Sequence, residues 1–293
     1  ATSQYACLHT IPLAFFLQSR RHKLYPKSII FLFLILLCGD IQINPGPVPT
    51  TSFNICSFNI HSFTNENHFT ALADYAEIHN VKLFALTETW ITPSTTFAQL
   101  CDATPPGFTL ISSPRPAPPS NHKKIIGGGT AFLIHDSCTI LSSSSKIFKS
   151  FELSSITIKL LKSNLTVFNI YRNHYILKSA QKKPHTLSHE PRELVPFSEF
   201  LHEFSIFIST AATTPNEFII TGDLNIHVDN PSDPHSQLFI SLLDSANLIQ
   251  HVNFPTHNKG HTLDLVITNK DSHLSPSITH SLISPSNHFP IFS

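Results

Sequence analysis

The segment Phe218-Ile219-Ile220-Thr221-Gly222-Asp223-Leu224-Asn225 passes from an apolar run through a glycine to two polar side chains. The run has the length and β-branched content of a buried strand, and Gly222 permits a sharp turn after it. Asp223 and Asn225 are two residues apart, so an extended chain would project both side chains the same way. A carboxylate beside an amide can orient a water and bind a phosphate oxygen, whereas the competing interpretation is an Asx turn that closes a strand. The segment therefore marks a candidate site at a strand end.

The sequence around this segment alternates between strand and helix patterns from Ser52 onward. We expect strands at 52–60, 81–86, 130–134, 156–160, 165–171, 218–221 and 263–268. Helical spacing of apolar residues predicts helices at 66–79, 197–208 and 238–243. The segments 92–124 and 178–192 are polar and proline-containing, and we expect loops there. Helices between strands favour α/β layering over an all-β sandwich.

Composition restricts the classes of protein that remain. The 293 residues suffice for one large domain or two small ones, and only 13% of them are charged. The formal net charge is zero, so overall electrostatics would hold a nucleic acid only weakly. Five cysteines without a Cys-x-x-Cys pair argue against a disulfide framework or zinc ribbon and favour a reducing, intracellular location. The chain begins at Ala1 and has no Met, so we expect it to be part of a longer translated frame.

An apolar run at 29–37 precedes the string Gly39-Asp40-Ile41-Gln42-Ile43-Asn44-Pro45-Gly46-Pro47. The run is shorter than the ~20 residues that a membrane span needs, so we expect no stable membrane association. The string resembles the 2A-like ribosome-skipping peptides, which end in Asp-Val/Ile-Glu-x-Asn-Pro-Gly-Pro. The matching residues are Asp40, Asn44, Pro45, Gly46 and Pro47, while Gln42 replaces the usual Glu. We therefore expect a leader at 1–47 and a separate domain at 52–293, although a plain Asn-Pro-Gly turn would read the same way.

Two further acidic residues adjoin apolar strands. Glu88 follows Leu83-Phe84-Ala85-Leu86-Thr87, and a strand-end carboxylate is a plausible ligand for Mg²⁺, which prefers oxygen. Asp264 lies inside an apolar strand, where its carboxylate must find a partner. His288 is a candidate, because a carboxylate that holds one imidazole nitrogen leaves the other available as a general base. A purely structural buried acid is the alternative interpretation.

Seven segments in this order resemble the endonuclease/exonuclease/phosphatase superfamily, which contains deoxyribonuclease I and the apurinic endonucleases. The likeness is greatest to the endonuclease domain of non-LTR retrotransposons and spans about 53 to 293. It implies a two-sheet α/β sandwich with helices on the outer faces. The matching segments are Ser57-Phe58-Asn59-Ile60-His61-Ser62, Leu86-Thr87-Glu88-Thr89-Trp90, Gly127-Gly128-Gly129-Thr130-Ala131-Phe132, Asn169-Ile170-Tyr171-Arg172, Gly222-Asp223-Leu224-Asn225, Thr262-Leu263-Asp264-Leu265 and Ser286-Asn287-His288-Phe289-Pro290.

The resemblance implies metal and phosphate sites. The metal, Mg²⁺ with Mn²⁺ as the alternative ion, would lie near Glu88, Asn59 and Asn287. The phosphate or substrate would contact Asn59, Arg172 and Asn225. Asn287 stands where the family has Asp, which would weaken the metal site, and Asn173-His174 replace the prolines that usually follow the Tyr-Arg pair.

The resemblance also implies catalytic roles. Asp223 would orient or deprotonate the attacking water, and Tyr171 would stabilise the phosphate or leaving group. Asp264 would hold His288, which would contact the scissile phosphate or share in base catalysis. The expected activity is nicking of DNA that primes reverse transcription, with DNA and the reverse transcriptase domain of the same element as partners. The alternatives are a non-catalytic relic of the same domain and a phosphoesterase that acts on another phosphate ester.

The skipping motif generates a prediction that does not depend on the folded domain. Residues 1–60 placed between two reporter proteins should yield two separate products in cell-free translation, because the bond before Pro47 is not made. Pro47→Ala should yield one product, since a primary amine would replace the constrained ring nitrogen. Gel electrophoresis of the products checks this, and one full-length product from the unmutated fusion would contradict the skipping assignment.

Overall fold

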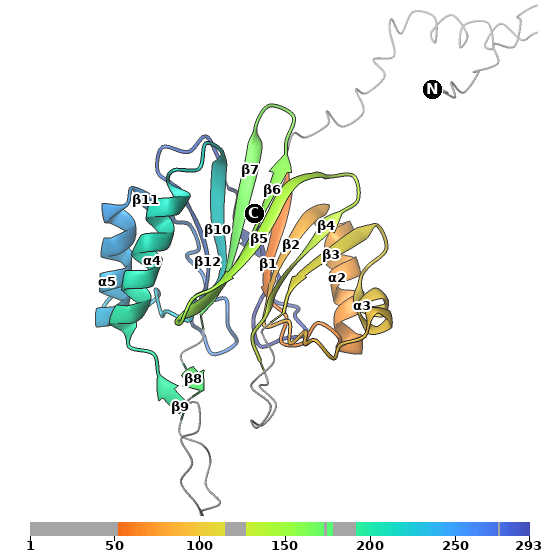
Figure 1. The fold of residues 1–293 in the computed structure, drawn as a ribbon, viewed down its shortest axis with the longest axis horizontal. Helices are drawn as coiled ribbons and strands as arrows, with labels where there is room; N and C mark the ends of the chain where they lie inside the picture. The colour runs from red at the N-terminus through yellow and green to blue at the C-terminus, as the bar shows by residue number, and fades with distance from the viewer. Residues whose placement is uncertain (1–51, 115–126, 173–174, 178–191, 275) are drawn as a thin grey trace, which may run out of the picture. The chain divides into compact units, whose positions relative to one another are not determined.

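Two six-stranded sheets, each mixing parallel and antiparallel neighbours, form the centre of the fold (Figure 1). The computed structural model describes residues 52–114, 127–172, 175–177, 192–274 and 276–293. The leader at 1–47 and its skipping motif lie outside the described residues. Phe53–Ser293 form one compact unit. None of the helices in the described part of the chain combines the length and hydropathy that a membrane crossing requires.

The first sheet places the ends of β1 and β2 at one edge. These strands are parallel, so Asn59 at the end of β1 lies beside Thr87 at the end of β2. The C-terminal β14 returns to pair with the other side of β1. The strand order in this sheet is β13 (Thr279–His280), β14 (Ile291–Phe292), β1 (Asn54–Asn59), β2 (Val81–Thr87), β4 (Thr130–His135) and β3 (Phe108–Ser113).

The second sheet brings three candidate site residues side by side. Asp223 at the end of β10 is in register with Tyr171 on β7 and with Asp264 on β12. The strand order is β11 (Leu248–Gln250), β12 (Asp264–Asn269), β10 (Glu217–Asp223), β7 (Asn164–Arg172), β6 (Phe151–Lys159) and β5 (Thr139–Ile147). A separate small hairpin consists of β8 (Tyr175–Leu177) and β9 (Arg192–Leu194).

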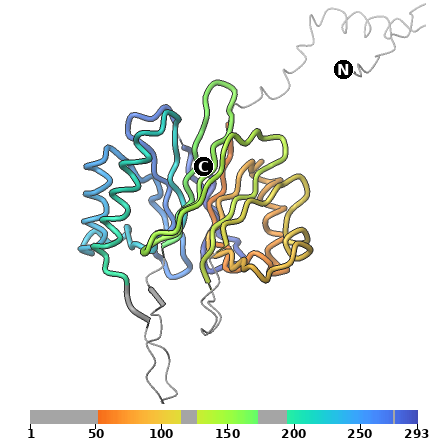
Figure 2. Tube along the Cα trace, viewed as in Figure 1, coloured from red at the N-terminus to blue at the C-terminus, as the bar shows by residue number. Residues whose placement is uncertain are grey.

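Four helices in the described residues cover the outer faces of the sheets (Figure 1). The first sheet carries α2 (Glu66–Ile78) and α3 (Phe97–Ala103), and the second carries α4 (Phe197–Ala211) and α5 (Pro234–Ser245). The colours in Figure 2 show that each sheet with its helices comes mainly from one half of the chain, apart from the returning C-terminal strands. The expected two-sheet sandwich with outer helices is confirmed.

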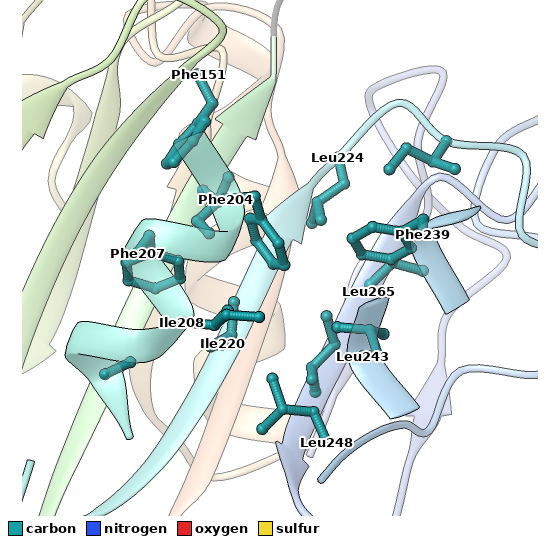
Figure 3. Close-up of a cluster of buried hydrophobic side chains, with 14 of the residues drawn as sticks. Phe151, Phe204, Phe207, Ile208, Ile220, Leu224, Phe239, Leu243, Leu248 and Leu265 are labelled. Carbon is teal, nitrogen blue, oxygen red and sulfur yellow. The ribbon is translucent and has the colours of Figure 1, made fainter. Parts of the chain in front are cut away.

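Three apolar layers hold this arrangement together. Between the sheets, Leu83 and Phe132 from the first meet Val167 and Val266 from the second. A second layer packs α2 on the first sheet, and a third packs α4 and α5 on the second. Figure 3 shows side chains of α4, α5 and β10 meeting in the third layer. Strands buried on both faces read as continuous apolar runs, which explains why β2 and β10 were recognisable in the sequence.

Several elements were not expected from the sequence, and three of them are longer than three residues. The predicted loop at 92–124 contains α3 and β3, and residues 139–147 form β5, a strand with every residue exposed. Of the residues in α3 only Ala103 is buried, and Leu100 is partly buried against the same apolar layer. The signal for this helix was the capping box of Thr96 and Gln99 at its start. The loop prediction for 92–124 was wrong because the many prolines and serines of that segment outweighed the short apolar patterns of α3 and β3. β5 has no buried face, so it lacks the alternation that indicates a strand.

Gly222 in β10 is a position at which the fold requires glycine. Its φ is +122°, and an added Cβ would lie 2.1 Å from the backbone oxygen of Ile170 on the neighbouring strand. Gly260 also has a positive φ, +84°, but an added Cβ there would meet nothing within 4 Å. A substitution at Gly260 therefore tests the cost of a positive φ alone, whereas one at Gly222 tests that cost together with steric overlap.

We expect Gly222→Ala to prevent folding or to lower the free energy of unfolding by more than about 3 kcal/mol, because β10 and β7 would have to separate. Gly260→Ala should cost only the left-handed backbone penalty of about 1–2 kcal/mol. Urea unfolding followed by circular dichroism measures both. Equal losses in the two variants would show that the close approach to Ile170 is not what restricts position 222.

Candidate active site

A buried carboxylate–imidazole pair joins the two sheets at one edge. Oδ2 of Asp264, at the start of β12, lies 2.7 Å from Nδ1 of His288, in the segment before β14. Asp264 is 1% exposed, and its backbone N–H donates to Oγ1 of Thr256 at 3.0 Å. His288 is held through its own backbone N–H, which donates to Ser286 Oγ. The pairing expected from the sequence is present, and Nε2 of His288 is turned toward Asp223.

Asp223 accepts hydrogen bonds from two asparagine side chains. Asn59 Nδ2 donates to Asp223 Oδ2 at 2.8 Å, and Asn225 donates to the same carboxylate from its backbone N–H at 3.0 Å and from Nδ2 at 3.2 Å. Nε2 of His288 lies 4.0 Å from Asp223 Oδ2 and 3.4 Å from Asn59 Nδ2. The carboxylate thus has fixed amides around it and an imidazole facing it.

The turn after β10 forms the Asx turn that was the competing interpretation of the sequence, because the backbone N–H of Asn225 donates to Asp223 Oδ1 at 3.0 Å. An extended chain was expected to project both side chains the same way. Instead Asn225 adopts a left-handed conformation with φ +52°, and its amide folds back onto the carboxylate. Asparagine tolerates this conformation better than most residues. Nδ2 of Asn225 also donates to the backbone oxygen of Arg172 at 2.9 Å, which ties the turn to the end of β7.

The charges of this cluster shift two pKa values. Burial opposes protonation of His288, but the carboxylates of Asp264 and Asp223 outweigh it and raise the pKa of His288 to about 9. Burial, with the nearby Asp264 carboxylate, raises the pKa of Asp223 to about 7, and His288 only partly opposes this. His288 is therefore a cation at neutral pH, whereas Asp223 titrates near neutrality, the range in which a general base is effective.

Glu88 and Tyr171 form a second polar group beside the first. Oε2 of Glu88 accepts from the indole Nε1 of Trp90 at 2.6 Å and from the backbone N–H of Gly128 at 2.6 Å. Oε1 of Glu88 accepts from the hydroxyl of Tyr171. Tyr171 is the β7 neighbour of Asp223, so the two polar groups adjoin along the edge of the second sheet.

Two of the expected site residues lie apart from this cluster. The guanidinium of Arg172 donates to the backbone oxygens of Leu224 and Asn225 and stacks against the rings of Phe197 and Phe200. Its burial lowers its pKa to about 10. These contacts stabilise the 223–225 turn through its backbone oxygens.

Asn287 is exposed, and its Oδ1 accepts from the side chain of Asn258 at 3.0 Å. This hydrogen bond holds the side chain of Asn287 against the loop that contains Asn258. Asn287 therefore does not join the carboxylates of the cluster in this structure.

The cluster fits a divalent cation. Among the described residues, Asp223, Asp264 and His288 form the one group whose potential ligand atoms lie within 4.8 Å of one another. Oδ1 of Asn59 and Oδ1 of Asp264 are buried and accept no hydrogen bond from the described residues. Two buried carboxylates face one imidazolium, so negative charge is in excess. Oxygen donors with spare negative charge are the set that Mg²⁺ or Mn²⁺ prefers.

Several positioning residues were not singled out from the sequence. Thr256 Oγ1 accepts from the backbone N–H groups of both Leu263 and Asp264, and so fixes the start of β12. Ser286 Oγ donates to the backbone oxygen of Asn59 at 2.8 Å. Glu152 on β6 is buried, and its carboxylate accepts from the backbone N–H of Gly129 at 2.7 Å. Ser286 lay within a matching segment, but Thr256 and Glu152 carry no local pattern that separates them from ordinary polar residues.

Most of the chain matches a known protein family. The sequence profile described as "Endonuclease/Exonuclease/phosphatase family" matches residues 52–288. No curated protein matches the sequence significantly.

Solved structures similar to the chain include an endonuclease domain, another catalytic domain and a phosphatase. The endonuclease domain of TRAS1, a telomere-specific non-LTR retrotransposon, is 12% identical, with a TM-score of 0.55 over 82% of this chain and 96% of that one. The catalytic domain of Xenopus laevis APE2 is 14% identical, with a TM-score of 0.57 over 82% and 90%. A mannosyl-6-phosphatase of Bacteroides thetaiotaomicron is 15% identical, with a TM-score of 0.53 over 82% and 98%. At these identities the likeness establishes the fold.

The raised pKa of His288 predicts how stability depends on pH. The pKa of His288 in the folded chain, about 9, exceeds the ordinary histidine value of 6.5, so its contribution to stability is complete below pH 6.5 and is lost as the pH rises through 9. In metal-free buffer His288→Asn should therefore cost more stability at pH 6 than at pH 9.5. The difference should be at most about 3 kcal/mol.

Urea unfolding at both pH values measures this difference. The matched control is His202→Asn, at an exposed position on α4, which should show no comparable pH dependence. The same cost for His288→Asn at both pH values would contradict the strong coupling between His288 and the two carboxylates.

Proposed function

Because the chain belongs to the endonuclease/exonuclease/phosphatase family, we propose that it is a divalent-metal-dependent phosphodiesterase that nicks DNA. The observation that supports this best is the buried cluster in which Asp223 lies between two amides and faces the Asp264–His288 pair. The cluster combines a carboxylate of raised pKa with a fixed cation, which are the two charges that phosphate-ester hydrolysis uses.

In the proposed reaction, Asp223 accepts the proton of the attacking water. The water oxygen forms the new bond to phosphorus, the bond from phosphorus to the 3′ oxygen breaks, and that leaving oxygen takes up a proton from solvent. The products are a 5′-phosphate and a 3′-hydroxyl. Protonated His288, oriented by Asp264, would contact a nonbridging phosphate oxygen through Nε2. The amides of Asn59 and Asn225 would bind the phosphate by exchanging their hydrogen bonds to Asp223 for bonds to phosphate oxygens. Tyr171 lies next to Asp223 along the sheet, where its hydroxyl can approach the phosphate or leaving group.

A divalent cation would be held by the side-chain oxygens of Asn59 and Asp223. The carboxylate of Asp264 would add negative charge nearby. The unpartnered buried Oδ1 of Asn59 supports this assignment. When bound, the ion would neutralise charge that develops on the phosphate. Glu88, which the family resemblance places at the metal, is bonded to Trp90, Gly128 and Tyr171 and would need to exchange one of these partners to serve as a ligand.

The nick would serve retrotransposition. A free 3′-hydroxyl at the cut strand is the primer that a reverse transcriptase requires, and the reverse transcriptase domain of the same element would be the partner. The fold is shared with the TRAS1 endonuclease domain, which comes from a non-LTR retrotransposon. The skipping motif ahead of the domain also supports this setting, since it would release the domain from whatever is translated before it.

Supercoiled plasmid tests the activity directly. Purified chain should convert it to the nicked circle with Mg²⁺ or Mn²⁺ and not with chelator. Asp223→Asn and His288→Asn should each slow nicking by about 100-fold or more, because each removes a group that moves or compensates charge in the transition state. Agarose gels measure the rate, and circular dichroism verifies folding.

Two exposed positions supply matched controls for these variants. Asp244→Asn changes a carboxylate that pairs with Lys270, and His202→Asn changes an exposed imidazole. Both should nick at the unmutated rate. Full activity in Asp223→Asn would end the assignment of the site. If a small phosphate monoester is cleaved and plasmid is not, the alternative phosphoesterase interpretation replaces the endonuclease.

A further inference from the structure

Trp90, the single tryptophan of the chain, forms a partly exposed aromatic pair with His61. The ring centroids are 4.3 Å apart, and the planes meet at 61° in an edge-on arrangement. His61 is exposed, and neither residue belongs to the three apolar layers of the fold. Packing of the core therefore does not account for the pair.

Hydrogen bonds connect this pair to the candidate active site. Trp90 donates through Nε1 to Glu88, which also accepts from the hydroxyl of Tyr171, the neighbour of Asp223. His61 follows Asn59 by two residues at the end of β1. The next residue, Ser62, donates from its backbone N–H to the backbone oxygen of Glu88 at 2.8 Å. The aromatic pair thus borders the same sheet edges as the catalytic cluster.

The backbone holds both rings in an uncommon conformation. His61 and Trp90 have φ values of +51° and +55°, a left-handed region that histidine tolerates but that a residue as bulky as tryptophan rarely adopts. The backbone N–H of Trp90 donates to Gly128 at 2.9 Å, and a Cβ added at Gly127 would lie 3.2 Å from Glu88 Oε2 and 3.7 Å from Trp90 Nε1. Such strain persists where the surroundings over-determine it, and it clusters at ligand-binding sites.

We propose that the His61–Trp90 pair is a stacking site for an unstacked nucleobase next to the cleaved phosphate, an inference that rests on the proposed function. The indole N–H is committed to Glu88, so the pair offers aromatic surface rather than a hydrogen-bond donor. Every nucleobase has an aromatic face, so this contact tolerates any sequence. The chain has no net charge to attract phosphates, and stacking would supply affinity that electrostatics does not.

Tryptophan fluorescence reports on this site, because Trp90 is the single tryptophan and excitation at the long-wavelength edge of its absorption band does not excite the five tyrosines. The chain is titrated in chelator, so that no cleavage occurs, with single-stranded oligothymidylate or with an abasic oligomer of the same length and charge. Oligothymidylate should quench the fluorescence and saturate, while the abasic oligomer should quench weakly. Equal quenching by both, or none by oligothymidylate, would overturn the proposal.

Paired substitutions at Trp90 and at His61 distinguish the loss of an aromatic face from the loss of the hydrogen bond to Glu88. Trp90→Phe and Trp90→Leu both lose the bond to Glu88, but only Phe keeps an aromatic face. Anisotropy of labelled oligothymidylate should show binding about 5- to 100-fold weaker for Leu than for Phe. His61→Ala should likewise bind more weakly than His61→Phe. Equal affinity within both pairs would assign Trp90 a purely structural role and overturn the stacking site.

The stacking site and the proposed function can fail separately. Base-dependent quenching in a chain that does not nick plasmid with Mg²⁺ or Mn²⁺ upholds the stacking site and removes the phosphodiesterase. Nicking without base-dependent quenching removes the stacking site alone.

Discussion

The hydrogen bond from Asn59 to Asp223 joins the two sheets at the point on which the candidate site depends. Asn59 ends a strand of the first sheet and Asp223 ends a strand of the second, 164 residues later. The Asp264–His288 bond crosses between the same sheets nearby. Buried Asn169 on β7 adds hydrogen bonds from Nδ2 to the backbone oxygens of Leu86 and Ala131 in the first sheet, and apolar packing between the sheets surrounds these polar links. The polar edge therefore requires the whole sandwich, because neither sheet alone contains both halves of either pair.

Burial of the charged groups at this edge costs free energy. Hydrogen-bond donors that the fold holds in place offset part of that cost. Two carboxylates exposed by 1% each share one imidazolium, so the isolated cluster holds uncompensated negative charge. Backbone and asparagine N–H groups stabilise Asp223, while Thr256 orders the chain at Asp264. The remaining excess charge is what a cation would neutralise. Stability and metal affinity are thus coupled, since a site without the ion must tolerate a carboxylate whose pKa is raised toward 7.

The sequence was informative where burial imposes a pattern and uninformative where it does not. Strands β2 and β10 are apolar on both faces and were recognisable, as was the apolar stripe of α4. The pairing of Asp264 with His288 could be proposed because a carboxylate in an apolar strand needs a partner. By contrast, β5 is fully exposed and looks like a polar loop. The return of Asn225 onto Asp223 depends on a left-handed residue, and the binding of Glu88 by Trp90 depends on another, which residue spacing cannot reveal.

Arg172 illustrates how position in the fold decides what a charged residue does. In the sequence it adjoins Tyr171, and a guanidinium there suggests a phosphate contact. In the structure it reaches beneath the 223–225 turn, between two backbone oxygens and two phenylalanine rings. From there its charge still favours the ionised form of Asp223, although it does not face the cluster edge where a substrate would bind. Within the described cluster, the cationic side chain that faces Asp223 is therefore His288 and not Arg172.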